Sequence, residues 1–280
     1  MRAVRRICTE ATMHDDDHGP QLQGDLRTFM KRGLSTSANR RQVLKGLFGF
    51  SVLTVVACGT DSDPGSTLEN DDGTCNIIPE ETAGPYPGDG SNGVNALTLS
   101  GIVRSDIRTS IGDLSGTAAG VPMTITLTLL DQDCAPLVGK AIYLWHCDRD
   151  GAYSMYDVEE QNYLRGVQET DADGKVTFTS IFPACYAGRW PHMHFEVYES
   201  LATATSSSNV LATSQLAIPE AACADVYGTA DGYDRSVDNL AGVSLESDNV
   251  FSDGTTRQLA TVTGSVDDGY AATLSFAIAV

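Results

Sequence analysis

The sequence predicts an all-β fold: an antiparallel β-sandwich preceded by a disordered N-terminal export signal and linker. Short apolar runs, rich in β-branched and aromatic residues, recur from residue 122 to the C-terminus. Clusters of Gly, Asp, Asn and Pro separate these runs, and convincing amphipathic helical patterns are almost absent. Strands at this spacing are typical of antiparallel sandwiches and barrels.

The expected strands follow one another along the chain. Residues 122–131, PMTITLTLLD, alternate strictly between apolar and polar side chains, which indicates a strand with one buried face. Four further runs are predicted as strands: GKAIYLWHC (139–147), KVTFTSIF (175–182), HMHFEVY (192–198) and AATLSFAIAV (271–280). The segment SQLAIPEAACADVYG, residues 214–228, has room for one short helical turn.

Residues 1–57 have the features of an N-terminal extension and an export signal. Arg40–Arg41 precede an apolar run, residues 44–57, that is nearly free of charge. A run of about 14 residues is too short to cross a bilayer, which takes about 20. The paired arginines resemble a twin-arginine export signal, and VVAC resembles a lipobox in which Cys58 is lipidated. The alternative is an ordinary signal peptide cleaved near Ala57. Both predict export to the periplasm or cell surface, the first with a possible lipid anchor in the membrane.

Residues 58–74 are acidic and rich in Gly and Ser, which predicts a flexible linker before a folded domain at 75–280. The chain has a net charge of −19. From Cys58 onward, 9 Lys and Arg stand against 32 Asp and Glu. Such a field repels nucleic acid and anionic lipid surfaces, so nucleic-acid binding is excluded as the function. Nothing in the sequence indicates an oligomeric state.

Five cysteines follow Cys58, and they lie at positions 75, 134, 147, 185 and 223. Disulfides persist in an oxidising compartment, where an odd number of cysteines allows at most two bridges and leaves one thiol. No CxxC motif is present, so a zinc–thiolate site is not expected. The spacing leaves the connectivity open.

Two of only five histidines stand in one predicted strand, as His192 and His194. Residues i and i+2 of a strand share a face, with Cα atoms about 6.5–7 Å apart, so the two imidazoles can bind one metal ion. The alternative is one surface histidine and one hydrogen-bonded core histidine. Tyr186 precedes the pair across a loop-like segment, and Tyr153 follows the strand AIYLWHC through DRDGAYS.

The order and spacing of these motifs resemble the intradiol ring-cleavage dioxygenases, the family of protocatechuate 3,4-dioxygenase and catechol 1,2-dioxygenase. The resemblance lies in LWHCDRDGAYS, QETDADGKVTFTSIFPACY and GRWPHMHF, within residues 136–198. EETAGPYPGDG, residues 80–90, resembles the segment near the N-terminus of these enzymes that walls the pocket. The resemblance weakens after about residue 215.

The resemblance implies a non-haem Fe(III) cofactor with four protein ligands, Tyr153, Tyr186, His192 and His194. It implies that Tyr186 is the tyrosine that leaves the metal when substrate binds. It also implies that Arg189 stabilises negative charge on the reacting ring.

Two further residues are candidates for the pocket, Tyr86 in its wall and Gln168 near the metal ligands. Two departures from the family pattern stand out. Tyr143 occupies a position where the family usually has an acidic residue. Cys147 and Cys185 flank the site; we interpret them as structural, with a disulfide or a redox role left open.

The ligands suit this chemistry because phenolate is a hard anionic oxygen donor and Fe³⁺ is a hard ion. Two phenolates and one hydroxide neutralise the ion. A catechol that gives one proton to the hydroxide and one to a tyrosinate leaves the site neutral again, so no net charge is buried. We therefore expect a catechol-type aromatic diol and O₂ as substrates and a cis,cis-muconate-type diacid as product.

Other interpretations stay open. A sandwich of this build could be an exported binding module for a metal, an aromatic compound or a sugar, without catalysis. The two histidines could instead bind zinc or copper, with the tyrosines structural. The acidic domain and the lack of a further Arg or Lys near the site favour an uncarboxylated diol, but the particular catechol stays open.

Overall fold

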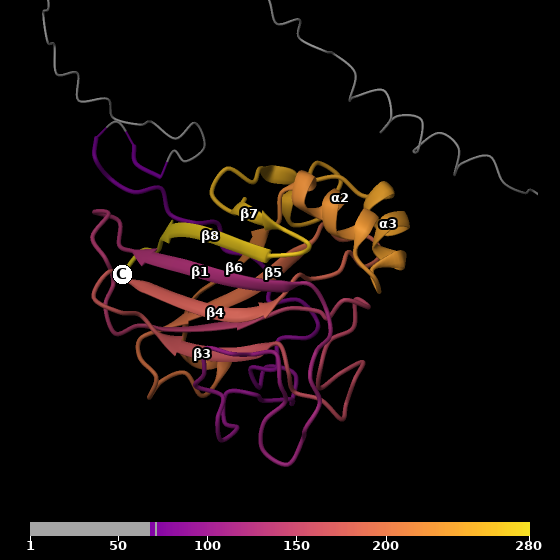
Figure 1. Ribbon diagram of the computed structural model, residues 1–280. Helices are drawn as coiled ribbons and strands as arrows, with labels where there is room; N and C mark the ends of the chain where they lie inside the picture. Colours follow the sequence, from indigo (N-terminus) through magenta and orange to yellow (C-terminus); the bar gives the residue numbers. More distant parts are fainter. Residues whose placement is uncertain (1–67, 71) are drawn as a thin grey trace, which may run out of the picture. The chain divides into compact units, whose positions relative to one another are not determined.

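The structure, a computed structural model, describes residues 68–70 and 72–280 (Figure 1). The expected export signal, residues 1–57, Cys58 and most of the expected linker lie outside these residues. The last part of the expected linker forms a turn, in which the Asn70 amide donates to the Thr74 carbonyl over 2.7 Å. The turn leads into Cys75, which forms a disulfide with Cys134.

Eight strands in the described part form two four-stranded sheets, as the sequence predicts for a sandwich. The first sheet has the order β4-β1-β8-β7. Its strands are β1 (Pro122–Leu130), β4 (Lys175–Ile181), β7 (Thr261–Ser265) and β8 (Gly269–Ala277). β1 pairs antiparallel with β4 but parallel with β8. The β1–β8 pair is thus the one parallel exception among the strand pairs of the described sandwich. A parallel pair needs a long crossover, and the whole second sheet lies between β1 and β8 in the chain.

The second sheet has the order β3-β2-β5-β6, and each of its pairs is antiparallel. Its strands are β2 (Ala141–Trp145), β3 (Arg165–Glu169), β5 (His192–Tyr198) and β6 (Val210–Ala217). Strands β3, β6 and β7 were not expected. β3 and β7 have only five residues each and are mostly polar or Gly, and β6, VLATSQLA, lacks a strict alternation of apolar and polar side chains, so periodicity gives little signal there.

The main core lies between the two sheets. On β1 the alternation expected from the sequence holds: Ile125 and Leu127 are buried, whereas Thr124 and Thr126 are more exposed. β5 differs because all of its side chains are buried. Met193, Phe195 and Val197 belong to the main core. The opposite face of β5, which starts with the two histidines, lies under the loops of the second sheet.

Two helices lie at one end of the sandwich (Figure 1). They are α2 (Glu220–Thr229) and α3 (Asp234–Ala241), and the short 3₁₀ helices η1 (Ser207–Asn209) and η2 (Phe251–Asp253) flank this region in the chain. The expected helical turn within 214–228 thus becomes the end of β6 followed by a full helix. Pro219 directly before α2 and Glu220 in its first turn favour a helix start there. None of the helices in the described residues is long and apolar enough to cross a membrane.

Cys147, Cys185 and Cys223 are buried free thiols. A disulfide between the first two, which the sequence left open, is not formed. Each of those two thiols instead contacts a backbone carbonyl, Cys147 that of Ala184 at 3.7 Å and Cys185 that of Arg189 at 3.4 Å. They are therefore structural packing groups in the loop that leads to β5.

Candidate metal centre

The two histidines of β5 lie side by side on the face of the strand that the loops cover. His192 and His194 are 1% and 2% exposed, and their Nε2 atoms lie 3.1 Å apart. They are two residues apart on one strand, so the pleat points both imidazoles the same way. The strand pairs on both sides, with β2 and β6, which fixes the backbone beneath them.

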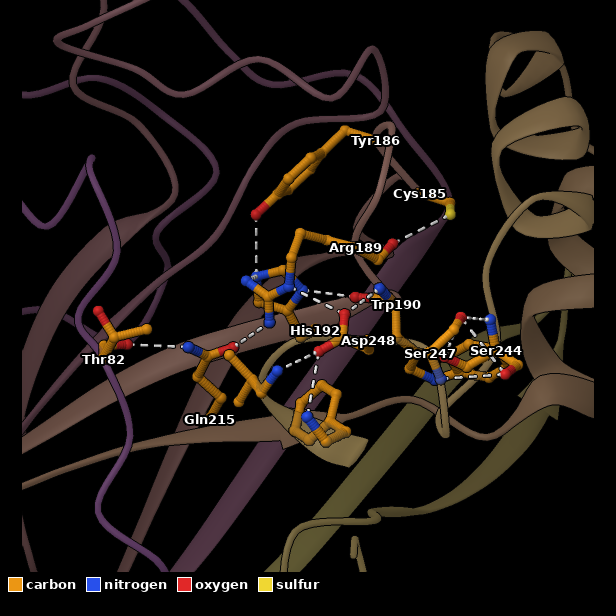
Figure 2. A network of polar contacts seen from close by, with 12 residues as sticks. Thr82, Cys185, Tyr186, Arg189, Trp190, His192, Gln215, Ser244, Ser247 and Asp248 are labelled. Carbon is orange, nitrogen blue, oxygen red and sulfur yellow. Dashed lines mark hydrogen bonds and ion pairs between the residues drawn. The ribbon is translucent and has the colours of Figure 1, made fainter. Parts of the chain in front are cut away.

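The two tyrosines reach the same point from loops. The Tyr153 hydroxyl lies 3.3 Å from Nε2 of His194, and the Tyr186 hydroxyl lies 3.1 Å from Nε2 of His192. The two phenolic oxygens are 3.5 Å apart. Figure 2 shows the Tyr186 hydroxyl directed toward the His192 ring. The structure therefore brings together all four side chains that the resemblance singles out as ligands.

Two glycines allow this close approach of the loops. Gly84, at φ +72°, lies so near His194 that a Cβ would be 3.3 Å from its Cε1 atom. Gly151, at φ +83°, would place a Cβ 3.1 Å from that of Tyr186. Both φ values lie in the left-handed region that glycine adopts without strain. The loops carrying Tyr86 and Tyr153 can thus lie directly on the site.

The protonation of His192 follows from its surroundings. Its Nδ1 lies 2.5 Å from the Trp190 carbonyl, which can only accept, so Nδ1 carries the proton and Nε2 keeps a lone pair. Burial and then the nearby Arg189 lower the pKa of His192 to about 3. Burial and then His192 hold the pKa of His194 well below its usual value. Both imidazoles are therefore neutral at pH 7, which is the form that binds metals.

His194 has a buried Nδ1 without a hydrogen-bond partner among the described residues. Its ring stacks on Trp145, with centroids 5.0 Å apart and planes 7° from parallel. Trp145 is itself a fully buried core residue. The orientation of His194 depends on this stacking and not on a hydrogen bond at Nδ1.

The four donor atoms fit a metal ion. For metal–ligand bonds of about 2 Å, neighbouring ligand atoms lie about 2.8–3.3 Å apart, close to the distances between these atoms. Burial raises the pKa of Tyr186 to about 12 and that of Tyr153 well above its usual value, so a nearby cation is needed to make them phenolates. Residues 68–70 and 72–280 hold no metal-type cluster of three or more His, Cys, Asp and Glu. The donors beside the two imidazoles are therefore phenols.

Arg189 lies at the edge of this centre, as the resemblance implies. Its Nη1 atom is 3.4 Å from Nε2 of His192. Its Nε donates to the Asp248 carboxylate over 2.9 Å, and its Nη2 donates to Gln215 Oε1 over 2.6 Å (Figure 2). Asp248 and Gln215 were missed from the sequence. They lie 59 and 26 residues from Arg189, and no local motif marks either one.

A cavity of about 790 Å³ opens beside the tyrosines. Its lining includes Tyr153, Tyr186 and Arg189, together with Tyr86, as expected. The remaining lining residues are Thr82, Gly84, Pro85, Asp150, Gly151, Ala152, Asp157, Arg235 and Asn249. The presence of Arg235, which α3 contributes, contradicts the expectation that the site lacks a further cation.

Gln168 does not take part in this site. It lies on β3, and its side-chain amide donates to the Thr177 carbonyl of β4 over 2.5 Å. The expectation that Gln168 lies near the metal ligands is wrong because its side chain bridges toward the other sheet. No signal in the sequence fixes which face of β3 it occupies.

Tyr143, which departs from the family pattern, supports the pocket wall. Its hydroxyl donates to the Pro87 carbonyl over 2.8 Å and accepts from Arg165 over 3.0 Å. Arg165 in turn donates to the Tyr86 carbonyl over 3.0 Å. The Tyr86 ring lies against Tyr153, with centroids 4.9 Å apart. This network holds the segment around Tyr86 over the site.

Comparisons with known proteins agree with this geometry. A family model described as Dioxygenase matches residues 104–204. Catechol 1,2-dioxygenase 2 of Acinetobacter lwoffii is 30% identical over 92 residues, 32% of this chain and 33% of that protein. Hydroxyquinol 1,2-dioxygenase of Nocardioides simplex is 30% identical over 104 residues, 31% of this chain and 36% of that protein. The chain thus spans about a third of the length of these curated relatives.

Among solved structures, an intradiol ring-cleavage dioxygenase from Tetranychus urticae superposes with a TM-score of 0.56 and 26% identity. The match covers 73% of this chain and 95% of that one. It extends well beyond residues 104–204, so the likeness includes most of the described sandwich.

Proposed function

We propose that this chain, which belongs to the intradiol ring-cleavage dioxygenase family, is a non-haem Fe(III) dioxygenase. In this proposal it cleaves a catechol-type ring between its two hydroxyl-bearing carbons with O₂ and yields a cis,cis-muconate-type diacid. The observation that carries the proposal is the convergence of two neutral imidazoles and two phenols, each within 3.5 Å of another, beside a cavity.

The proposed ligands are Tyr153, Tyr186, His192 and His194. Bound ferric iron would supply the positive charge that makes the phenols and the diol acidic, and the centre at which diol and O₂ react. The two tyrosines differ in their surroundings. Tyr153 is buried under Tyr86, whereas Tyr186 is half-buried on a loop. This difference supports Tyr186 as the residue that takes up a proton from the diol and swings away.

Arg189 is proposed to stabilise negative charge on the bound diol and oxygen. Two of its three guanidinium nitrogens are held by Asp248 and Gln215, and the third points toward His192. When the lone pair of His192 Nε2 is used by a metal, this third nitrogen is free to donate to a ligand in the cavity. The ion pair with Asp248 and the role at the site are therefore compatible.

The proposal is tested on the purified full chain by metal analysis, an absorption spectrum and O₂ uptake with a panel of diols. We expect about one iron per chain, a reddish tyrosinate-to-iron charge-transfer band and O₂ consumption equal to the diol lost. A colourless protein without turnover would instead support the binding module without catalysis. A colourless zinc-loaded protein would support a histidine site with structural tyrosines.

We also propose that the chain is exported, with residues 1–57 as the signal and Cys58 as a lipid anchor. The Cys75–Cys134 disulfide supports an oxidising destination, because disulfides are rare in reducing compartments. Labelling with a radioactive fatty acid and a Cys58→Ser variant test the anchor: the label should be present in the wild type and absent in the variant.

A further inference from the structure

Resting on the proposed function, we propose that Asp248 is a positioning residue of the active site, which holds Arg189 and the peptide at Trp190 in their working orientation. Asp248 lies outside residues 104–204, the stretch that the family model matches. It belongs to the segment after β6 that contains α2, α3 and η2. The segment would then be part of the site's construction and not only a cover for the sandwich.

Asp248 is fully buried, and both carboxylate oxygens are used. Oδ2 accepts from Arg189 Nε at 2.9 Å and from the Trp190 amide at 2.7 Å. Oδ1 accepts from the amides of Val250 and Phe251 at 2.8 and 3.1 Å. Burial alone would raise the pKa of Asp248, but the bonds from Arg189 and the backbone outweigh it and lower the pKa. The group is therefore an ionised, immobile carboxylate.

The Asp248 carboxylate and the side-chain amide of Gln215 hold the Arg189 guanidinium from two sides. Nε is held by Asp248, Nη2 is held by Gln215, and Gln215 is itself held by the Thr82 carbonyl at 2.8 Å (Figure 2). Only Nη1 is left to face the metal centre, 3.4 Å from His192. A planar guanidinium held at two of its three nitrogens can present only this one edge to a ligand.

The same carboxylate oxygen also acts on a proposed metal ligand. It binds the amide of Trp190, and the carbonyl of Trp190 accepts the Nδ1 proton of His192. Partners of this kind fix the tautomer and ring orientation of metal-binding histidines. One oxygen atom of Asp248 thus influences both Arg189 and His192.

α3 holds the other end of the same loop. Ser236 Oγ accepts from the Cys185 amide at 3.0 Å, and the Asn239 side chain donates to the Cys185 carbonyl over 2.8 Å. Cys185 directly precedes Tyr186. The loop from Cys185 to Trp190 is therefore anchored at both ends by the segment after β6.

The experiment compares wild type, Asp248→Asn, Arg189→Ala, the double variant and Asp238→Asn as full-length, iron-loaded proteins. Asp238 is an exposed acid of α3 and serves as the matched control. We expect Asp248→Asn to keep its iron and to lower kcat about 100-fold with little change in KM, since a misplaced group costs about this much. In the Arg189→Ala background, Asp248→Asn should lower kcat by much less than about 100-fold further, because of the two groups that Asp248 positions only the Trp190 peptide beside His192 is left.

A second readout does not depend on turnover. In the metal-free protein, hydrogen exchange of the Trp190 amide should be at least about 10-fold faster in Asp248→Asn than in wild type and unchanged in Asp238→Asn. If Asp248→Asn does not fold, Arg189→Lys replaces it. Lysine keeps the charge but cannot bond Asp248 and Gln215 together in a planar fork, so kcat should fall as far as in Arg189→Ala.

Three results would overturn the inference: an Asp248→Asn enzyme as active as wild type, a multiplicative loss in the double variant, or an Arg189→Lys enzyme with wild-type kcat. These outcomes differ from failure of the proposed function, in which the wild type itself consumes no O₂ with any diol.

Discussion

The Tyr186 hydroxyl lies 3.1 Å from Nε2 of His192, the nitrogen whose lone pair is left free by the bond between Nδ1 and the Trp190 carbonyl. A phenol and a neutral imidazole at this distance can share a proton or, with a cation between them, become neighbouring ligands. The second arrangement accounts for the presence of Tyr153 and His194 at the same point. The absorption spectrum of the iron-loaded protein distinguishes a shared proton from a pair of metal ligands.

Replacing Tyr186 by Phe should leave iron bound by three residues but shift or bleach the visible band. It should lower kcat about 100-fold, because the base for one diol proton is lost. Tyr270→Phe is the control, since its hydroxyl bonds Asp225 away from the centre. An unchanged band in Tyr186→Phe, or the same change in both variants, would contradict the assignment of Tyr186 as a ligand.

Iron removal by a chelator should destabilise the protein without unfolding it, because the sandwich core is separate from the centre. Iron present at about 100 times its dissociation constant stabilises the native state by about 2.7 kcal/mol, or roughly 5–10 °C in Tm. Thermal unfolding with and without iron measures this shift. His194→Ala should abolish the shift, whereas a shift of wild-type size in that variant would show that the metal binds elsewhere.

Stability should fall in acid, and His146 should account for part of the fall. Its ring is buried between the Cys147 carbonyl and the Ser180 hydroxyl, both at 2.7 Å, and burial lowers its pKa to about 4. The unfolded chain, with a His pKa near 6.5, therefore binds this proton first, so the stabilisation is complete above pH 6.5 and is lost as pH falls toward 4. The loss from this group is about 3 kcal/mol.

Urea unfolding of the metal-free protein between pH 7 and pH 4 checks this. The two histidines of the centre contribute in the same direction, so the comparison is between wild type and His146→Gln. The free energy of unfolding should depend less steeply on pH in the variant. Parallel curves would mean that His146 is not buried as a neutral group.

The proposed ligand set could be predicted from the sequence because each member sits in a local motif. His192 and His194 follow from strand periodicity alone, and Tyr153 and Tyr186 stand at fixed positions in quoted motifs that resemble a known family. The two tyrosines reach the strand only through loop geometry that glycines such as Gly84 and Gly151 permit.

The supporting residues could not be predicted in the same way. Asp248 reaches Arg189 from 59 residues further along the chain, and no local motif marks it. Gln168 shows the opposite kind of error. It stands beside a motif and was expected near the metal ligands, but its side chain donates to the Thr177 carbonyl of the other sheet. The parallel pairing of β1 with β8 likewise depends on how the chain returns after the second sheet, and strand patterns do not encode it.

Arg235 should influence which diol is preferred. It lines the cavity from α3, and it forms none of the ion pairs found among residues 68–70 and 72–280, whereas Arg189 is held by Asp248. Asp150 and Asp157 also line the cavity, so removal of the Arg235 charge makes the cavity more negative.

Arg235→Ala should therefore raise KM about 10-fold for a catechol with a propanoate side chain, because one charge-assisted hydrogen bond is lost. For unsubstituted catechol KM should hardly change, and for a catechol with an aminoethyl side chain it should fall. Steady-state O₂ uptake with the three diols measures this, with Arg108→Ala, whose partner is Asp106, as the control. An equal change for all three diols would show that Arg235 acts on the fold of α3 and not on the charge of the substrate.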